Sequence, residues 1–129
     1  MPQLLRRMDV IQESSTVAPA NLVAGYKQQG EDIISLGAGE PDFDTPVHIK
    51  PAGTFYAFPN VAAYYNKKDG IATSLQFCEY LLKTQRVAVV SGNAFGMDDH
   101  IRLSFSVSMK QLQPALDRIH EGLLAIERG

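Results

Sequence analysis

The sequence predicts an α/β domain of two layers, in which a small and mostly antiparallel sheet packs with helices. Residues 101–107 alternate between apolar and polar side chains, which is the period of a β-strand. Residues 108–126 instead repeat apolar side chains at helical spacing: Leu112, Ala115, Leu116, Ile119, Leu123 and Ile126. Short strands mixed with such helices favour a two-layer α/β sandwich.

The first half of the chain predicts one helix and one strand. Ala18, Leu22, Val23 and Tyr26 recur at helical spacing from Val17 to Gln29, and Gly30 is placed to end that helix. A short strand is expected over residues 32–36. The loop GAGEPDFDTP follows it, and its two glycines and two prolines exclude regular structure.

The second half predicts the order β-α-β-β-α. Residues 53–61 form an aromatic-rich strand, residues 66–70 a turn, and residues 86–90 a further strand. Thr73 with Gln76, and Ser108 with Gln111, have the spacing of capping boxes and mark two helix starts. Pro114 is awkward so early in the last helix, because it removes a backbone donor there, and it is expected to shift the true start.

Composition bounds the class of protein. The 129 residues are 45% hydrophobic and 20% charged, which is ordinary for one globular domain. A net charge of −2 does not indicate the basic surface that nucleic-acid-binding proteins typically have. No apolar run is long enough to cross a membrane, and the lone Cys78 sits in a helical pattern as expected buried filler. A cytoplasmic protein is the default expectation.

The join between Lys50 and Pro51 is the odd feature of the chain. PDFDTPVHIK resembles the start of a helix, but Pro51-Ala52-Gly53 breaks it after about one turn, too short to be stable. On this basis the single domain 1–129 is interpreted as two fused blocks, 1–50 and 51–129, as if an intervening segment had been removed.

Several phrases resemble a known family. LGAGEPDFDTP in the first block is specific, and GTFYAFP, VAVVSGNAFG, HIRLSFS and SMKQLQPALDRI follow in the second. Their order and spacing resemble class I, pyridoxal-phosphate-dependent aminotransferases of the aspartate aminotransferase type. The resemblance covers about residues 10 to 128. It implies that both blocks belong to the small domain of such an enzyme and that the large cofactor-binding domain is deleted.

The resemblance implies two vestigial substrate-binding residues, Arg102 and Gly39. Arg102, in HIRLSFS, matches the arginine that grips the substrate carboxylate, and its planar fork of donors suits a carboxylate. Gly39, in AGEPD, matches a glycine whose backbone approaches the substrate. Without the family, Arg102 would be interpreted as a surface arginine paired with a nearby acid, and Gly39 as a turn glycine.

The cofactor machinery of the family is missing from the sequence. None of the six lysines lies in the S-K-x-F-x-x-x-G-x-R setting of the Schiff-base lysine, and the phosphate loop and the aspartate facing the pyridine nitrogen are absent as well. Transamination depends on pyridoxal phosphate as an electron sink. We therefore expect no cofactor, no catalytic residue and no enzyme activity from this chain alone.

The sequence leaves three functions open. The first is a non-catalytic small domain, a deletion or minimised form of an aminotransferase. The second is a weak binding module for a dicarboxylate or an amino acid. The third is a subunit that docks on a separate cofactor domain. The former domain interface is expected to be exposed and to promote self-association, with Phe43, Phe95 and Met97 as candidates. The three histidines are too scattered for a metal site.

Overall fold

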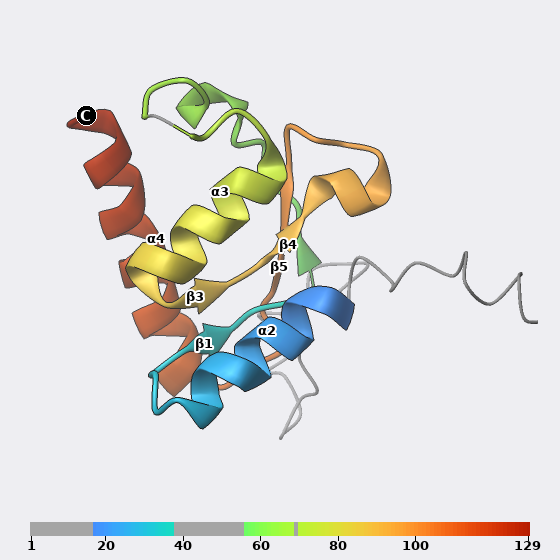
Figure 1. The fold of residues 1–129 in the computed structure, drawn as a ribbon, viewed down its shortest axis with the longest axis vertical. Coiled ribbons are helices and arrows are strands. Elements are labelled where there is room, and N and C mark those ends of the chain that lie inside the picture. The colour runs from blue at the N-terminus through green and yellow to red at the C-terminus, as the bar shows by residue number, and fades with distance from the viewer. Residues whose placement is uncertain (1–16, 38–55, 69) are drawn as a thin grey trace, which may run out of the picture.

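The computed structural model describes residues 17–37, 56–68 and 70–129. These residues form an α/β fold in which the helices α2 (Val17–Gln28), α3 (Ser74–Tyr80) and α4 (Met109–Glu127) accompany short strands (Figure 1). The α/β class is therefore confirmed. Several predictions lie outside the described residues: those for the Gly39 loop, for Phe43 and His48, and for the Lys50–Pro51 junction.

The strands lie in two small groups. β1 (Ile34–Ser35) pairs in parallel with β3 (Val87–Ala88). β2 (Tyr56–Ala57), β5 (Ile101–Ser104) and β4 (Val90–Ser91) pair antiparallel, in the spatial order β2-β5-β4. The strand predicted over residues 86–90 is one extended segment that changes partner at Val89, from β1 to β5.

Leu36 joins the two groups of strands. Its N–H donates to the carbonyl oxygen of Ala88 at 2.8 Å, and its own carbonyl oxygen accepts from the N–H of Ser104 at 2.6 Å. Leu36 is fully buried. The chain after β1 is thus inserted at the place where β3 and β5 diverge, and this insertion brings Gly37 close to β5.

The predicted alternation along β5 is correct only for its first half. Ile101 is buried and Leu103 packs against the main core, as expected. Ser104 and Ser106, predicted to lie on a polar outer face, are instead 1% and 4% exposed. The alternation does not continue because β5 ends at Ser104, whose N–H donates to the carbonyl oxygen of Leu36.

Helix α3 begins where its capping box predicts. The hydroxyl of Thr73 accepts from the N–H of Gln76. The Gln76 side chain reaches back to the N–H of Ala72, one residue before the cap. A π-helical segment, η3 (Leu81–Gln85), continues α3 and ends at Arg86, whose φ of 57° is left-handed. Phe77 and Leu81 from this helical run are fully buried in the main core.

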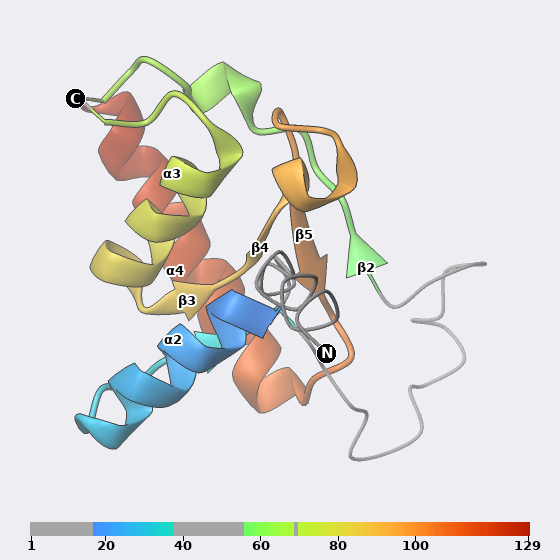
Figure 2. The ribbon, with the colours of Figure 1, turned by 45° about the vertical axis from the view of Figure 1, so that its right-hand side comes forward.

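Helix α4 packs beside α3 and η3 (Figure 2). Its buried residues are Ala115, Gly122 and Ile126, and the Tyr80 hydroxyl donates to the carbonyl oxygen of Gly122 at 2.9 Å. A side chain at position 122 would collide with Gln85 and Leu81 of η3. Glycine at this position therefore permits the close approach of the two helical elements.

Helix α4 starts at Ser108 as predicted, but the capping bond and the effect of Pro114 differ from the prediction. Ser108 is the N-cap, but its hydroxyl makes no capping bond; its carbonyl oxygen accepts from Gln111 and Leu112 instead. Pro114 does not shift the start, because α4 begins at Met109 and contains the proline in its interior. Packing of the long apolar stripe outweighs the missing backbone bond.

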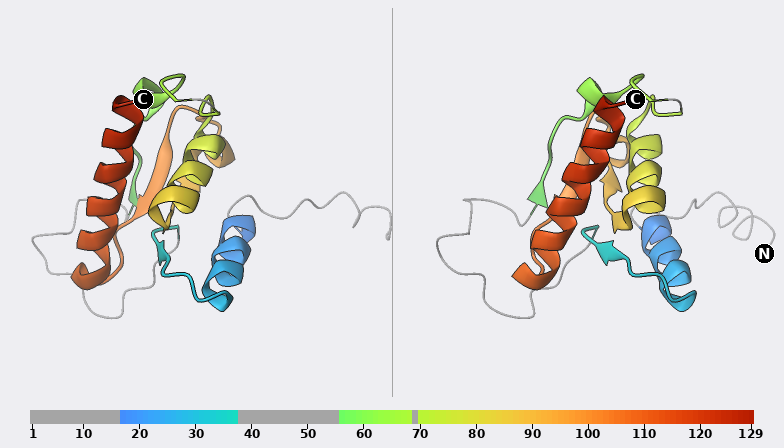
Figure 3. Two further views of the ribbon diagram at one scale, coloured as in Figure 1. Left: turned by 60° about the vertical axis from the view of Figure 1, so that its left-hand side comes forward. Right: turned by 90° about the vertical axis from the view of Figure 1, so that its left-hand side faces the viewer.

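Helix α2 lies apart from α4, beyond the lower end of α3 (Figure 3). It packs on a second, smaller core made of Val23, Ile33 and Ala88, with Tyr26 and Leu82 at its border. Gly30, at φ 82°, terminates α2 as predicted. In the described ranges, no helix has both the length and the apolar character required to cross a bilayer.

Candidate functional site

Arg102 lies on β5, on the sheet face opposite the main core. Val90 of β4 is its cross-strand partner, and the register of β2 with β5 pairs Tyr56 with Ser104. Because side chains alternate along strands, Tyr56, Arg102 and Ser104 share one face, whereas Ile101 and Leu103 point into the core. The predicted substrate residue is therefore on the face away from the core, as its place in the alternating pattern required.

Two aromatic rings frame the Arg102 guanidinium. Its Cζ lies 4.4 Å from the ring centroid of Tyr56 and 4.7 Å from that of Phe95. Phe58 extends this group, since it meets Phe95 edge to face at 5.9 Å and stacks on His100 at 5.0 Å. Contacts of a guanidinium with ring faces hold it in place without using its donors.

The backbone of Gly37 also holds Arg102. Nη2 of Arg102 donates to the carbonyl oxygen of Gly37 at 3.3 Å. A Cβ at position 37 would stand 3.4 Å from Cγ2 of Val90, so this segment runs close to β4. Arg102 is thus bonded to the described end of the loop that contains Gly39. Gly39 itself lies outside the described residues, and its predicted role stays a prediction.

Arg102 differs from Arg86 and Arg118, because each of those two forms an ion pair with a carboxylate. Nε of Arg86 pairs with Glu31 at 2.9 Å, and Nη2 of Arg118 pairs with Asp32 at 2.6 Å. In ranges 17–37, 56–68 and 70–129, no carboxylate lies within pairing distance of Arg102, and its buried Nε has no hydrogen-bond partner there. The alternative of an ordinary surface ion pair thus finds no support among these residues.

The loop that carries Phe95 is fixed to the start of α3. Oδ1 of Asp98 accepts from both the N–H and the hydroxyl of Ser74, at 3.1 and 2.7 Å. Because that hydroxyl proton is already used, the Ser91 hydroxyl donates to Ser74 Oγ at 2.6 Å. A carboxylate at the first N–H groups of a helix is also favoured by the helix dipole. This half-buried network positions η4 (Gly92–Phe95) and with it the Phe95 ring.

Asp99 and His100 complete the same loop. Asp99 pairs with Nδ1 of His100 at 2.6 Å and accepts from the side-chain amide of Asn60 at 3.0 Å. The hydrogen bond with His100 is the main cause that lowers the pKa of Asp99, so this carboxylate is negative at neutral pH. Asp98-Asp99-His100 is thus a charged turn that leads into β5.

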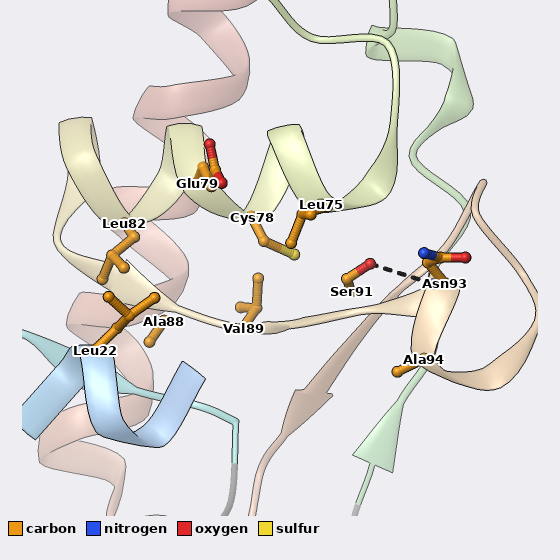
Figure 4. Close-up of a pocket in the computed structure, with 10 residues that line it drawn as sticks. All are labelled: Leu22, Leu75, Cys78, Glu79, Leu82, Ala88, Val89, Ser91, Asn93 and Ala94. Carbon is orange, nitrogen blue, oxygen red and sulfur yellow. Dashed lines mark hydrogen bonds between the residues drawn. The ribbon is translucent and has the colours of Figure 1, made fainter. Parts of the chain in front are cut away.

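An apolar cavity of about 190 Å³ lies elsewhere, between α2, α3 and the β3–β4 segment (Figure 4). Leu22, Leu75, Leu82 and Val89 contribute to its wall, and Cys78 lies among them. Cys78 is 9% exposed, and burial raises the pKa of its thiol to about 12. The thiol is therefore neutral and packed, as predicted for buried filler, and is unsuited to be a nucleophile.

The lining of this cavity offers no lysine to which pyridoxal phosphate, the cofactor of the family that the sequence resembles, could be attached. The cofactor requires a lysine for its imine and donors for its phosphate. Lys67 and Lys68 instead lie over the rings of Tyr64 and Tyr80, and Lys83 pairs with Glu79. The cavity lining contains neither lysine nor arginine. No group of three or more potential metal ligands occurs in the described part of the chain either.

Sequence reasoning identifies Arg102 but misses the residues around it. The sequence pattern marks Tyr56 and Phe58 only as part of an aromatic strand, and Phe95 only as a candidate for the exposed interface. Pairing the predicted strand 53–61 with strand 101–107 would bring Tyr56 and Phe58 toward Arg102, but the sequence pattern does not give the register of that pairing. The Ser74–Asp98 network that sets Phe95 has no recognisable signal.

The comparisons with known proteins agree on one family. Residues 45–119, more than half of the chain, match the model of "Aminotransferase class I and II". An aspartate aminotransferase of Rhizobium meliloti is 31% identical across 91% of this chain and 33% of its own length. A bifunctional aspartate aminotransferase and glutamate/aspartate-prephenate aminotransferase of Petunia hybrida is 42% identical across 60% of this chain.

A solved structure agrees with these relatives. The crystal structure of the aspartate aminotransferase from Rhizobium meliloti aligns with a TM-score of 0.51 and 37% identity over 55% of this chain and 19% of that one. The chain is much shorter than its relatives, since it spans 17% of the Petunia protein and 33% of the Rhizobium protein. This chain belongs to the class I and II aminotransferase family and corresponds to a part of such an enzyme.

Proposed function

We propose that this chain is the isolated small domain of an aspartate-aminotransferase-like enzyme: a half-site that binds a substrate carboxylate and performs no transamination alone. In this proposal residues 1–50 and 51–129 are two blocks of one two-layer sandwich, and the large cofactor domain is deleted between them. The protein is cytoplasmic and contains no pyridoxal phosphate. The family match and the short span relative to full enzymes support this assignment.

The observation that supports a carboxylate-binding half-site is that Arg102 has hydrogen-bond donors without a described acidic partner. Its Nη1 and Nη2 retain donors that Gly37 does not use, and no described acid neutralises it. A bidentate pair with a carboxylate uses such parallel donors. Affinity is weak, with a dissociation constant of about 1 mM, because one partly exposed ion pair contributes little.

The test is a titration with maleate followed by amide NMR. We expect shifts at Arg102 and Gly37 that saturate, and no shifts in Arg102→Ala. Arg118→Ala is the matched control, because it removes the same charge from an arginine already paired with Asp32. Binding that persists in Arg102→Ala, or vanishes equally in Arg118→Ala, contradicts the proposal. Turnover with pyridoxal phosphate above the cofactor-only rate contradicts the claim of inactivity.

The second candidate is a subunit that docks on a separate cofactor domain or on a second copy of this chain. The observation that favours it is the exposure of large apolar side chains around the site: Tyr56, Phe58, Phe95 and Met97 are each between 37% and 44% exposed. Exposed apolar groups of this size promote association. Co-purification with a cofactor-domain protein, lost on changing Phe95 and Met97 to serine, would distinguish docking from a free half-site.

A further inference from the structure

We propose that Ser74, at the start of α3, is a positioning residue of the carboxylate site. It acts on Arg102 indirectly, through the loop that carries Phe95. The inference rests on the proposed binding of a carboxylate by Arg102, and it names the part of the fold that fixes the arginine for this role. Ser74 is fully buried and therefore does not touch a ligand itself. Any effect of Ser74 on binding must pass through its neighbours.

The Ser74 hydroxyl is the point at which the loop is attached to α3. It donates to Oδ1 of Asp98 at 2.7 Å, and its oxygen accepts from the Ser91 hydroxyl at 2.6 Å and from the N–H of Asn93 at 3.3 Å. The single proton and both lone pairs of this hydroxyl are therefore used. Asn93 belongs to η4, whereas Ser91 and Asp98 precede and follow it in the chain. One side chain thus holds the segment on both sides of η4.

Backbone hydrogen bonds close the same segment on itself. The N–H of Met97 donates to the carbonyl oxygen of Gly92 at 3.0 Å, and the N–H of Gly92 donates to that of His100 at 2.8 Å. A segment that is bonded internally and attached to α3 moves as a unit. We therefore expect that loss of the attachment to Ser74 also displaces the Phe95 ring.

The Phe95 ring contacts the charged group of Arg102. Its centroid lies 4.7 Å from Cζ, and the ring of Tyr56 lies 4.4 Å from the same atom. Nη2 of Arg102 donates to the carbonyl oxygen of Gly37 at 3.3 Å. A guanidinium held by these contacts loses less conformational freedom when a carboxylate binds than a mobile one does. Without the Phe95 contact, Tyr56 and one long hydrogen bond remain to hold it.

The experiment compares the maleate affinity of the full chain with that of Ser74→Ala by NMR titration. We expect Ser74→Ala to weaken binding about threefold to tenfold, the effect of leaving one long side chain mobile. Thr73→Ala is the matched control, because it removes the neighbouring hydroxyl, which bonds to Gln76 of its own helix. It should leave maleate affinity unchanged, although both variants weaken the start of α3. Dispersed spectra of each variant establish that it is folded.

A double-mutant cycle tests whether Ser74 acts through the Phe95 ring. Phe95→Leu keeps an apolar side chain without the ring and should weaken maleate binding as Ser74→Ala does. The double variant should bind no more weakly than Phe95→Leu alone, because both changes break the same link. Phe95→Tyr should retain the affinity, since position 95 is 43% exposed and the added hydroxyl has access to water. Additive losses in the double variant would show that Ser74 acts by another route and would overturn the inference.

The NMR signal of the Arg102 Nε–H group separates this inference from the proposed function. Ring currents of Tyr56 and Phe95 shift this signal, so it reports the position of the guanidinium with or without maleate. We expect Ser74→Ala to move it and Thr73→Ala to leave it in place.

The outcomes are distinguishable. If Arg102→Ala abolishes maleate binding but Ser74→Ala binds as tightly as Thr73→Ala, the half-site stands and the inference is overturned. An Nε–H signal that does not move in Ser74→Ala overturns it as well. If no maleate binds, or if binding survives in Arg102→Ala, the proposed function fails, and the Nε–H signal alone decides whether Ser74 positions Arg102.

Discussion

Gly92 is a residue whose small size the fold requires. A Cβ at this position would lie 2.2 Å from the carbonyl oxygen of Met97 and 2.3 Å from that of His100. Both atoms are backbone, and both belong to the loop that positions Phe95, so neither can yield without distorting that loop. Glycine is therefore required at position 92 by contact, and its φ is not in the left-handed region.

We predict that Gly92→Ala lowers the free energy of unfolding by about 3 kcal/mol, as overpacking against rigid backbone does. Gly25→Ala is the matched control, because its Cβ would meet nothing within 4 Å and the residue lies inside α2. That substitution should raise stability by about 0.5 to 1 kcal/mol through helix propensity. Urea unfolding of both variants measures this, and equal losses in the two would contradict the steric explanation.

Cys78 couples stability to alkaline pH. Its thiol titrates at an ordinary value of 9.0 when unfolded and at about 12 in the fold, where burial disfavours the thiolate. Between these values the unfolded chain releases a proton that the folded chain keeps, so the stabilising effect is full below pH 9.0 and is lost as pH rises toward about 12. Tyr65, whose pKa burial and Asp98 raise to about 12, acts with the same sign.

We therefore predict that stability falls between about pH 9 and about pH 12, by up to about 1.4 kcal/mol per pH unit for one fully coupled group. Cys78→Val, which keeps an apolar side chain and removes the thiol, should make this decline shallower, and the contribution of Tyr65 should remain. Urea midpoints at about pH 8 and about pH 10.5 measure the difference. An unchanged decline in Cys78→Val would show that the thiol is not the group responsible.

The helix starts show how a shared local pattern can have two outcomes. Thr73 and Ser108 have the same capping-box spacing, yet only Thr73 accepts a hydrogen bond from the third residue of its helix. The carbonyl oxygen of Ser108 accepts from the N–H groups of Gln111 and Leu112, the third and fourth residues of α4. The sequence identifies both as helix starts, but the side-chain rotamer at each depends on the chain that enters the helix.

We predict that Thr73→Ala destabilises the protein by about 1 kcal/mol, the usual cost of losing a side-chain cap. Ser108→Ala should change stability by less than about 0.5 kcal/mol, since no capping bond is removed. The two variants form a matched pair for thermal or urea unfolding. A loss at Ser108 as large as at Thr73 would mean that its hydroxyl caps α4 in solution.

The face on which a strand residue lies can be predicted where the local alternation of apolar and polar residues decides it. It cannot be predicted where contacts with a distant segment decide it. Ile101, Arg102 and Leu103 follow the predicted alternation because the core lies on one side of β5. Ser104 and Ser106 are buried although the alternation puts them on the outer face, and Ser104 donates its N–H to Leu36, far away in the sequence. The partner change at Val89 has the same origin, since β1 and β5 compete for one extended segment.

At the scale of the molecule, the family and the α/β class can be predicted because they depend on motifs and periodicity. The frame around Arg102 cannot, since it requires the β2–β5 register and the η4 loop together. Tyr56 and Phe95 are distant in sequence and meet only through that assembly. What the sequence does indicate is that the surface near Phe95 and Met97 is exposed, and both are, at 43% and 44%.

That exposure leads to a prediction for the whole molecule. We expect reversible self-association in sedimentation velocity between about 10 µM and about 1 mM, because apolar side chains gathered near one loop gain free energy when a second copy covers them. The double variant Phe95→Ser with Met97→Ser should remain monomeric over a wider range. Leu75→Ser with Leu116→Ser is the control, since these side chains are as exposed, at 53% and 45%, but lie on α3 and α4. A sedimentation coefficient independent of concentration would exclude association. An equal effect of the control pair would show that the association is non-specific and does not depend on the face that surrounds Arg102.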